Sequence, residues 1–112
     1  MVAPSAGDIV LVRFPFSDLS QAKLRPAACL AAAGRGDFIL CQITSNPYGD
    51  PLAVPLIDAD FAVGGLRIAS YARPGKLFTA SGGIMTSTVG TLGPSKLGEI
   101  LDAVVAMLRP VP

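Results

Sequence analysis

Hydrophobic and polar positions follow two different periods along the chain. Up to residue 92 the apolar residues come in short runs, rich in β-branched and aromatic side chains and bounded by Gly, Pro, Ser and Asp. Runs of this kind predict strands at residues 9–16, 26–33 and 38–44, with a polar loop at 17–24. Further short strands are expected at 52–57, 66–71, 76–80 and 85–92. Pro55 marks the first of these as an edge or bulged strand, and Pro74-Gly75 predicts a turn.

The last segment changes to a helical period. Its apolar residues recur every three or four positions, at Leu97, Ile100, Leu101, Val104, Val105 and Leu108. Pro94 is suited to the first turn of a helix and Pro110 stops one, so the pattern predicts a helix over residues 94–108. Five to seven short strands followed by one amphipathic helix indicate a mainly β fold, a small barrel rather than a parallel α/β sheet.

Composition narrows the possible functions. The chain has 112 residues, 51% of them hydrophobic, and a net charge of +1, which fits one domain with a buried core and argues against disorder. Such a charge excludes binding to nucleic acid by bulk charge alone, but it leaves room for a local basic cleft. The chain has no His, which removes imidazole acid–base catalysis, a His-assisted nucleophile and most transition-metal sites. We therefore expect no cofactor.

The cysteines and the first residues indicate the compartment. Cys29 and Cys41 lie inside apolar runs without metal-ligand spacing, and we interpret them as buried free thiols of a reducing cytoplasm, although strand geometry would decide on a disulfide. The N-terminus has no signal-peptide pattern, and no apolar run approaches the roughly 20 residues that span a bilayer. A cytoplasmic protein without a membrane partner is expected.

Two clusters of polar residues at predicted strand ends are candidates for chemistry. Lys23 and Arg25 lead from the polar loop into an apolar strand, where a guanidinium can bind a phosphate through two parallel hydrogen bonds. Gln42, Thr44 and Ser45 gather at the end of another strand, and alternation places Gln42 and Thr44 on one face. Taken singly, each cluster is more typical of a strand edge with no further role.

In their order along the chain, these pieces resemble the MazF/PemK family of bacterial toxins. The resemblance runs from about Gly7 to Leu108 through short matching segments, which are Gly7-Asp8-Ile9-Val10, Arg25-Pro26-Ala27, Ile43-Thr44-Ser45, Gly65-Leu66-Arg67, Ser70-Tyr71, Lys76-Leu77-Phe78 and Val89-Gly90-Thr91-Leu92. It implies a single toxin domain over residues 1–112, with an SH3-like barrel, a C-terminal helix and pairing as a homodimer. It also implies metal-independent cleavage of single-stranded RNA, inhibited by a cognate antitoxin.

By position, Arg25 and Thr44 match the family's catalytic Arg and Thr. RNA carries its own nucleophile, the 2′-OH, so the protein needs only to hold the phosphate and stabilise its charge. Single-stranded RNA is otherwise bound by stacking, by hydrogen bonds to bases and by cations along the backbone. The candidates for these contacts are Lys23, Gln42, Ser45, Asp58 (also the best spare carboxylate), Tyr71 and Arg73, with Phe16 and Lys76 as further possibilities.

Other functions stay open at this stage. A toxin-like barrel without catalysis would act only as an interaction module. A gyrase poison of the CcdB type shares the fold but depends on a C-terminal Trp, and this chain has none. An unrelated small β-barrel would have no enzymatic role at all.

Overall fold

The structure is a computed structural model that describes residues 3–15 and 22–112. Phe16, which the sequence suggested as a stacking platform, lies outside the described residues.

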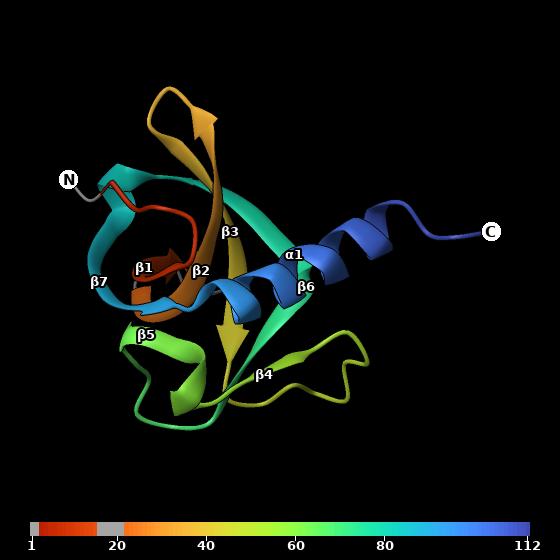
Figure 1. The fold of residues 1–112 in the computed structure, drawn as a ribbon. Helices are drawn as coiled ribbons and strands as arrows, with labels where there is room; N and C mark the ends of the chain where they lie inside the picture. Colours follow the sequence, from red (N-terminus) through yellow and green to blue (C-terminus); the bar gives the residue numbers. More distant parts are fainter. Residues whose placement is uncertain (1–2, 16–21) are drawn as a thin grey trace.

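The described residues form one antiparallel sheet of seven strands and a C-terminal helix (Figure 1). The strands are β1 (Asp8–Pro15), β2 (Ala22–Gly34), β3 (Asp37–Thr44), β4 (Val54–Leu56), β5 (Phe61–Gly64), β6 (Ser70–Ser81) and β7 (Met85–Leu92). Their order across the sheet is β4-β6-β3-β2-β1-β7-β5. Two short 3₁₀ turns, η1 (Asp58–Asp60) and η2 (Gly82–Ile84), precede β5 and β7, and α1 (Pro94–Leu108) ends the fold. The mainly β prediction is confirmed.

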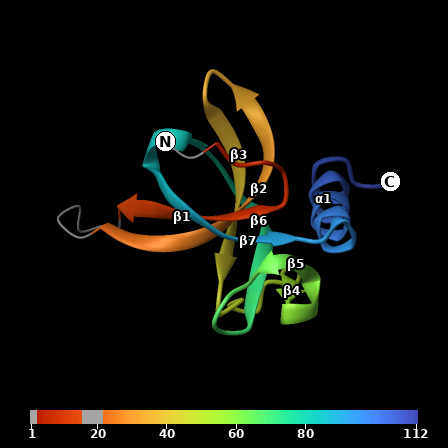
Figure 2. The ribbon, with the colours of Figure 1, turned by 60° about the vertical axis from the view of Figure 1, so that its left-hand side comes forward.

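Irregular pairing curls the sheet into a half-barrel. The register between β1 and β7 shifts twice, and the register between β3 and β6 shifts beyond Cys41. Each such bulge bends a strand and increases its twist. Figures 1 and 2 show the result, with β1 and β7 turned away from the plane of β3 and β6, and α1 lying along the outside of the sheet.

Alternation along the strands produces a hydrophobic cluster on each face of the sheet. Ile9, Cys41 and Ile43 pack with Ile100 and Val104 of α1 in the first cluster. The second cluster lies on the other face and contains Val10, Val12, Ala27, Cys29, Leu40, Ala80 and Met85. Because neighbouring residues of one strand enter different clusters, both faces of the central strands are apolar and buried.

The helix over residues 94–108 is confirmed, and Pro94 stands in its first turn. The second strand starts earlier than predicted, since β2 begins at Ala22 and pairs with β1 from Pro15 onward. Lys23 therefore lies in a strand and not in the preceding loop. Pairing with β1 extends β2 at this end, and the propensities of single residues contain no information about such pairing.

Two further predictions about strands were wrong. Pro74-Gly75 does not end a strand, because β6 continues through it as an irregular stretch of residues 73–76 opposite Gln42. Pro74 is buried in this stretch, where the strand pairing is irregular, so the N–H that proline lacks is not needed for a ladder hydrogen bond. The segment 66–69 is a connection rather than a strand, and β5 was not predicted. By contrast, Pro55 lies in β4, an edge strand as expected.

Candidate functional site

Arg25 and Thr44 lie where two neighbouring strands separate. The ladder of β2 and β3 pairs Cys29 with Leu40, Ala28 with Cys41 and Ala27 with Gln42, and it ends there. Continued by two residues, the same register places Arg25 opposite Thr44. Residues opposite each other in an antiparallel pair lie on the same face of the sheet, so the two side chains share a face. Pro26 stands at the break, and it has no N–H to donate to β3.

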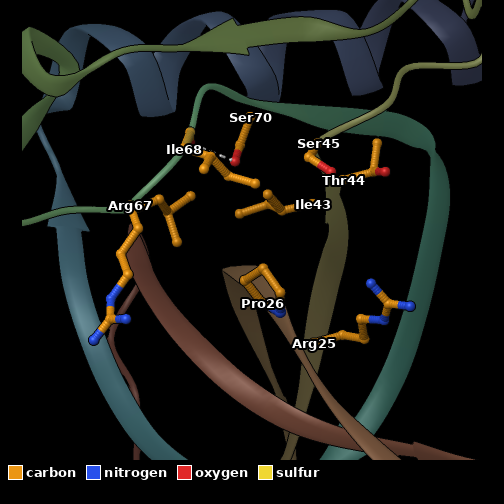
Figure 3. A pocket seen from close by; sticks show the side chains of 9 residues that line it. Arg25, Pro26, Ile43, Thr44, Ser45, Arg67, Ile68 and Ser70 are labelled. Carbon is orange, nitrogen blue, oxygen red and sulfur yellow. Dashed lines mark hydrogen bonds between the residues drawn. The ribbon is translucent and has the colours of Figure 1, made fainter.

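A pocket of about 140 Å³ opens at this separation. Its lining comes from β2, from the end of β3 and from the connection between β5 and β6, and consists of Arg25, Pro26, Ile43, Thr44, Ser45, Leu66, Arg67, Ile68 and Ser70. Figure 3 shows Pro26 and Ile43 in the middle, Arg25 below Thr44 on one side, and Arg67 on the other. The pocket therefore has an apolar centre with charged and hydroxyl groups around it.

Backbone contacts hold two hydroxyl groups of the pocket. The Thr44 hydroxyl donates to the carbonyl oxygen of Asn46 at 3.0 Å and accepts from the N–H of Asn46 at 3.1 Å. The buried Ser70 hydroxyl donates to the carbonyl oxygen of Ile68 at 2.9 Å. Both groups thus have fixed positions at the rim, which is what a preorganised binding site requires.

The described pocket lining contains two arginines and no carboxylate. Arg25 and Arg67 are both exposed, and neither Asp nor Glu is part of the lining. Away from the pocket, Asp50 pairs with Arg73 at 3.0 Å, and Asp60 and Glu99 both contact Lys96. A concave site with two guanidinium groups and three hydroxyl side chains suits an anion such as a phosphodiester.

Solved structures resemble this fold over nearly the whole chain. A chain of the MazE–MazF complex from Deinococcus radiodurans (form III) has a TM-score of 0.75 at 20% identity, covering 94% of this chain and 95% of its own. The Mycobacterium tuberculosis toxin MazF-mt6 has a TM-score of 0.69 at 20% identity, covering 90% and 95%. An endoribonuclease in complex with its cognate antitoxin, from a mycobacterial species, has a TM-score of 0.72 at 16% identity over 100% of both chains. The chain has the MazF fold. No family model and no curated protein matches the sequence, so at this identity the likeness is one of fold.

The MazF fold brings three of the predicted site residues into the pocket and three others next to it. Arg25, Thr44 and Ser45 line the pocket itself. Lys23 is exposed two residues before Arg25 in β2, and Gln42 lies two residues before Thr44 in β3. Tyr71 of β6 pairs with Thr44 of β3. Alternation places Lys23 on the face of Arg25 and Gln42 on that of Thr44.

The remaining predicted residues lie outside the pocket lining. Arg73 is bound to Asp50 and lies over the ring of Tyr48, with 5.8 Å from its guanidinium carbon to the ring centroid. The backbone N–H of Leu52 and the Arg73 side chain lower the pKa of Asp50, so this ion pair persists below neutral pH. Asp58 is exposed on η1, and its carboxylate lies near Gly65. Lys76 is exposed in the irregular stretch of β6.

Sequence reasoning missed the second wall of the pocket as a site. Leu66 and Arg67 entered the prediction through the family resemblance, and residues 66–71 were predicted as a strand, but nothing in their local pattern marks them as part of a binding site. The available signal was the pair of glycines before them, Gly64-Gly65, which indicates a tight change of direction. A change of direction alone does not tell where the following residues go.

The described residues offer little support for other chemistries. Within residues 3–15 and 22–112, no group of three or more His, Cys, Asp or Glu side chains is placed to hold a metal ion. In the same part of the chain, no helix has the length and apolar character needed to cross a membrane. Cys29 and Cys41 are free and buried, as predicted, and burial raises the pKa of both thiols, that of Cys41 to about 11. Neither is a thiolate nucleophile at neutral pH.

Proposed function

We propose that the chain is the toxin of a toxin–antitoxin pair and that it cleaves single-stranded RNA without a metal ion. One observation carries the proposal, which is that Arg25 and Thr44, from two neighbouring strands, line the same pocket. The likeness in fold adds support, since the similar structures include an endoribonuclease with its antitoxin and MazE–MazF complexes. The proposal extends to a toxin domain spanning residues 1–112.

The chemistry needs few groups from the protein. The 2′-oxygen of the ribose attacks the adjacent phosphorus, a bond forms between them, and the bond from phosphorus to the 5′-oxygen breaks. The products are a 2′,3′-cyclic phosphate and a 5′-hydroxyl, the proton of the 2′-OH passing to water and the leaving oxygen taking one from water. Arg25 stabilises the charge on the phosphoryl oxygens, and the Thr44 hydroxyl donates to one of them. Arginine keeps its proton at any cellular pH, so its part is electrostatic.

Residues around the pocket extend the surface for RNA. Tyr71 offers a ring for a base next to Thr44, Lys23 continues the positive charge from Arg25, and Ser45 adds a hydroxyl at the rim. Gln42 offers an amide for base recognition. Arg73 and Asp58 belong to the outer part of this proposed surface, where they would contact RNA beyond the scissile phosphate.

Two partners complete the proposal. A homodimer would bring two such pockets into one particle, and light scattering that gives a monomer at micromolar concentration would contradict it. A cognate antitoxin would inhibit cleavage by binding the toxin. The proposed place of action is the cytoplasm, where single-stranded RNA is available.

The test is cleavage of a long single-stranded RNA in the presence of EDTA. We expect discrete fragments whose 3′ ends carry a 2′,3′-cyclic phosphate, identified by end-mapping. Arg25→Ala is the matched variant, and it should reduce the rate by at least about 10²–10³, the usual effect of losing a donor to a developing oxyanion. Because Arg25 is exposed, this variant should keep its fold, which circular dichroism checks.

Two results would contradict the proposal in different ways. Intact RNA across several varied sequences, with folded protein, excludes the endoribonuclease and favours a non-catalytic interaction module. Cleavage by Arg25→Ala at the parental rate removes Arg25 from the mechanism and leaves the activity to other residues.

A further inference from the structure

The wall of the pocket opposite Arg25 contains a second guanidinium that the proposed chemistry does not use. Arg67 lies in the connection between β5 and β6, and Figure 3 shows it across Pro26 and Ile43 from Arg25. Its side chain is exposed, and the described residues include no carboxylate paired with it. A cation left unneutralised at the rim of a pocket is available to an anionic ligand.

The backbone around Arg67 is fixed although its side chain is exposed. On one side, Leu66 packs against the cluster that contains Ile43 and Ile100, and the N–H of Gly65 donates to the carbonyl oxygen of Val89 at 3.3 Å. On the other side, the Ser70 hydroxyl binds the carbonyl oxygen of Ile68. Arg67 is therefore presented from an anchored connection, which limits the entropy lost when its guanidinium binds a ligand.

The surface between the two arginines is apolar. Pro26, Ile43, Leu66 and Ile68 line it, and they offer no charged group to a ligand. A ligand that suits this surface has an anionic group at each end and an uncharged unit between them. Single-stranded RNA has this form, because a nucleoside separates each pair of neighbouring phosphates. A pocket with an apolar wall and a few convergent polar groups is the usual form of a binding site.

We propose that Arg67 forms a second phosphate subsite, which binds the phosphate neighbouring the scissile one while Arg25 holds the scissile phosphate. This inference deepens the proposed function and rests on it for the identity of the strand. Arg67 acts through binding alone. Its loss should therefore raise KM and leave kcat nearly unchanged, in contrast to the loss of Arg25.

The test separates binding from cleavage by using a ligand that cannot react. A fluorescently labelled, random-sequence, single-stranded 2′-fluoro RNA keeps the phosphates but lacks the nucleophile. Its Kd, measured by anisotropy at several salt concentrations, gives a slope of log K against log salt of about 0.7 for each phosphate contact. Arg67→Met should weaken binding about tenfold and reduce this slope by about 0.7. Arg67→Lys keeps the charge and should keep most of the slope.

Arg109→Met is the matched control, because it removes the same charge from the end of α1, outside the pocket. It should leave the Kd and the slope near those of the parent. Equal effects of Arg67→Met and Arg109→Met would overturn the subsite, and so would a change in kcat with KM unaffected.

The outcomes also distinguish this inference from the proposed function. If the parent protein binds the unreactive RNA with the expected effect of Arg67→Met but cleaves no RNA, the endoribonuclease fails and the phosphate subsite stands. If the parent protein does not bind the RNA at all, both fail.

Discussion

The hydroxyl of Thr44 shows how a single residue is prepared for a ligand. Its oxygen accepts from the N–H of Asn46, and its proton is directed at the carbonyl oxygen of the same residue. The accepted bond fixes the position of the oxygen, whereas the proton can turn toward a phosphate by rotation about the C–O bond. The donor is thus held in place by the backbone before a ligand arrives.

Thr44→Val tests this donor with little change of shape. We expect the rate of RNA cleavage to fall by roughly 10²–10³, because the variant loses a hydrogen bond to the transition state. Thr44→Ser keeps the hydroxyl and should retain most of the activity. Single-turnover kinetics measure both, and a Val variant as fast as the parent would reduce Thr44 to a residue that ends a strand.

Gln42 presents the opposite situation, a buried polar atom. Its Oε1 lies opposite the irregular stretch of β6 that contains Pro74, and it accepts no hydrogen bond from residues 3–15 or 22–112. A buried acceptor in this state costs on the order of 1–3 kcal/mol of desolvation. An apolar side chain of similar length would avoid this cost at the same position.

Gln42→Met should therefore stabilise the protein while weakening its function. Met has a similar length and no polar group to desolvate, so the free energy of unfolding should rise by about 1 kcal/mol. Urea unfolding measures this change, and RNA cleavage measures the loss. A variant with lower stability would show that the amide makes a contact worth more than its desolvation.

The backbones of β5 and β7 approach each other closely where the two strands pair. Gly64 has φ +65°, and a Cβ built on it would collide with the carbonyl oxygen of Val89 and lie 2.8 Å from the Cα of Gly90. A Cβ on Gly90 would in turn lie 3.0 Å from the carbonyl oxygen of Val63. The glycines thus allow β5 to pair with β7, and the connection that carries Arg67 begins directly after Gly64.

Gly64→Ala should cost more stability than the same change at a glycine with free space. Gly36, in the turn between β2 and β3, also has positive φ, 79°, but nothing lies within 4 Å of its Cβ position. Gly36→Ala should cost about 1–2 kcal/mol from the backbone alone, and Gly64→Ala about 1–3 kcal/mol more from the collision. Urea unfolding of both variants checks this. Equal losses would mean that β5 moves away without cost.

The pairing of elements also explains what the sequence could predict of the site. A run of apolar residues predicted the strand that ends at Thr44, and a helical period predicted the helix of residues 94–108. Alternation along the strand put Gln42 and Thr44 on one face. The register that brings Arg25 opposite Thr44 depends on which strands pair, and no local pattern contains that information. The position of Arg67 is harder still to predict, because it depends on the path of the connection between β5 and β6. Contacts with β7 and with the hydrophobic core fix that path.

At the scale of the whole molecule, the sheet separates two hydrophobic clusters that share no residue. Cys29 lies in one and Cys41 in the other, on opposite faces of β2 and β3. In the ladder Cys41 pairs with Ala28 and not with Cys29, so their Cβ atoms point apart and no disulfide can join them. Each thiol reports on the integrity of its own cluster.

Reaction of these thiols with a disulfide reagent should follow unfolding. Burial raises the pKa of Cys41 to about 11, so at pH 8 its native thiol is almost entirely neutral, and it is also shielded from the reagent. An unfolded thiol with a pKa of about 8.5 reacts readily. We expect slow labelling in water that accelerates in urea in proportion to the unfolded fraction.

The same shift in pKa determines how stability depends on pH. The folded state favours the neutral thiol of Cys41, so the free energy of unfolding should decrease as the pH rises from about 8.5 toward about 11, where Cys41 ionises in the unfolded state and stays neutral in the folded state. Cys41→Ala should remove the contribution of Cys41 to this pH dependence, and Cys29→Ala that of Cys29; urea unfolding at several pH values measures both.

The same two variants test whether the two faces of the sheet unfold together. If both label their remaining thiol at the same rate across urea concentrations, they do. A thiol that labels well before the unfolding transition would show that its face of the sheet opens independently.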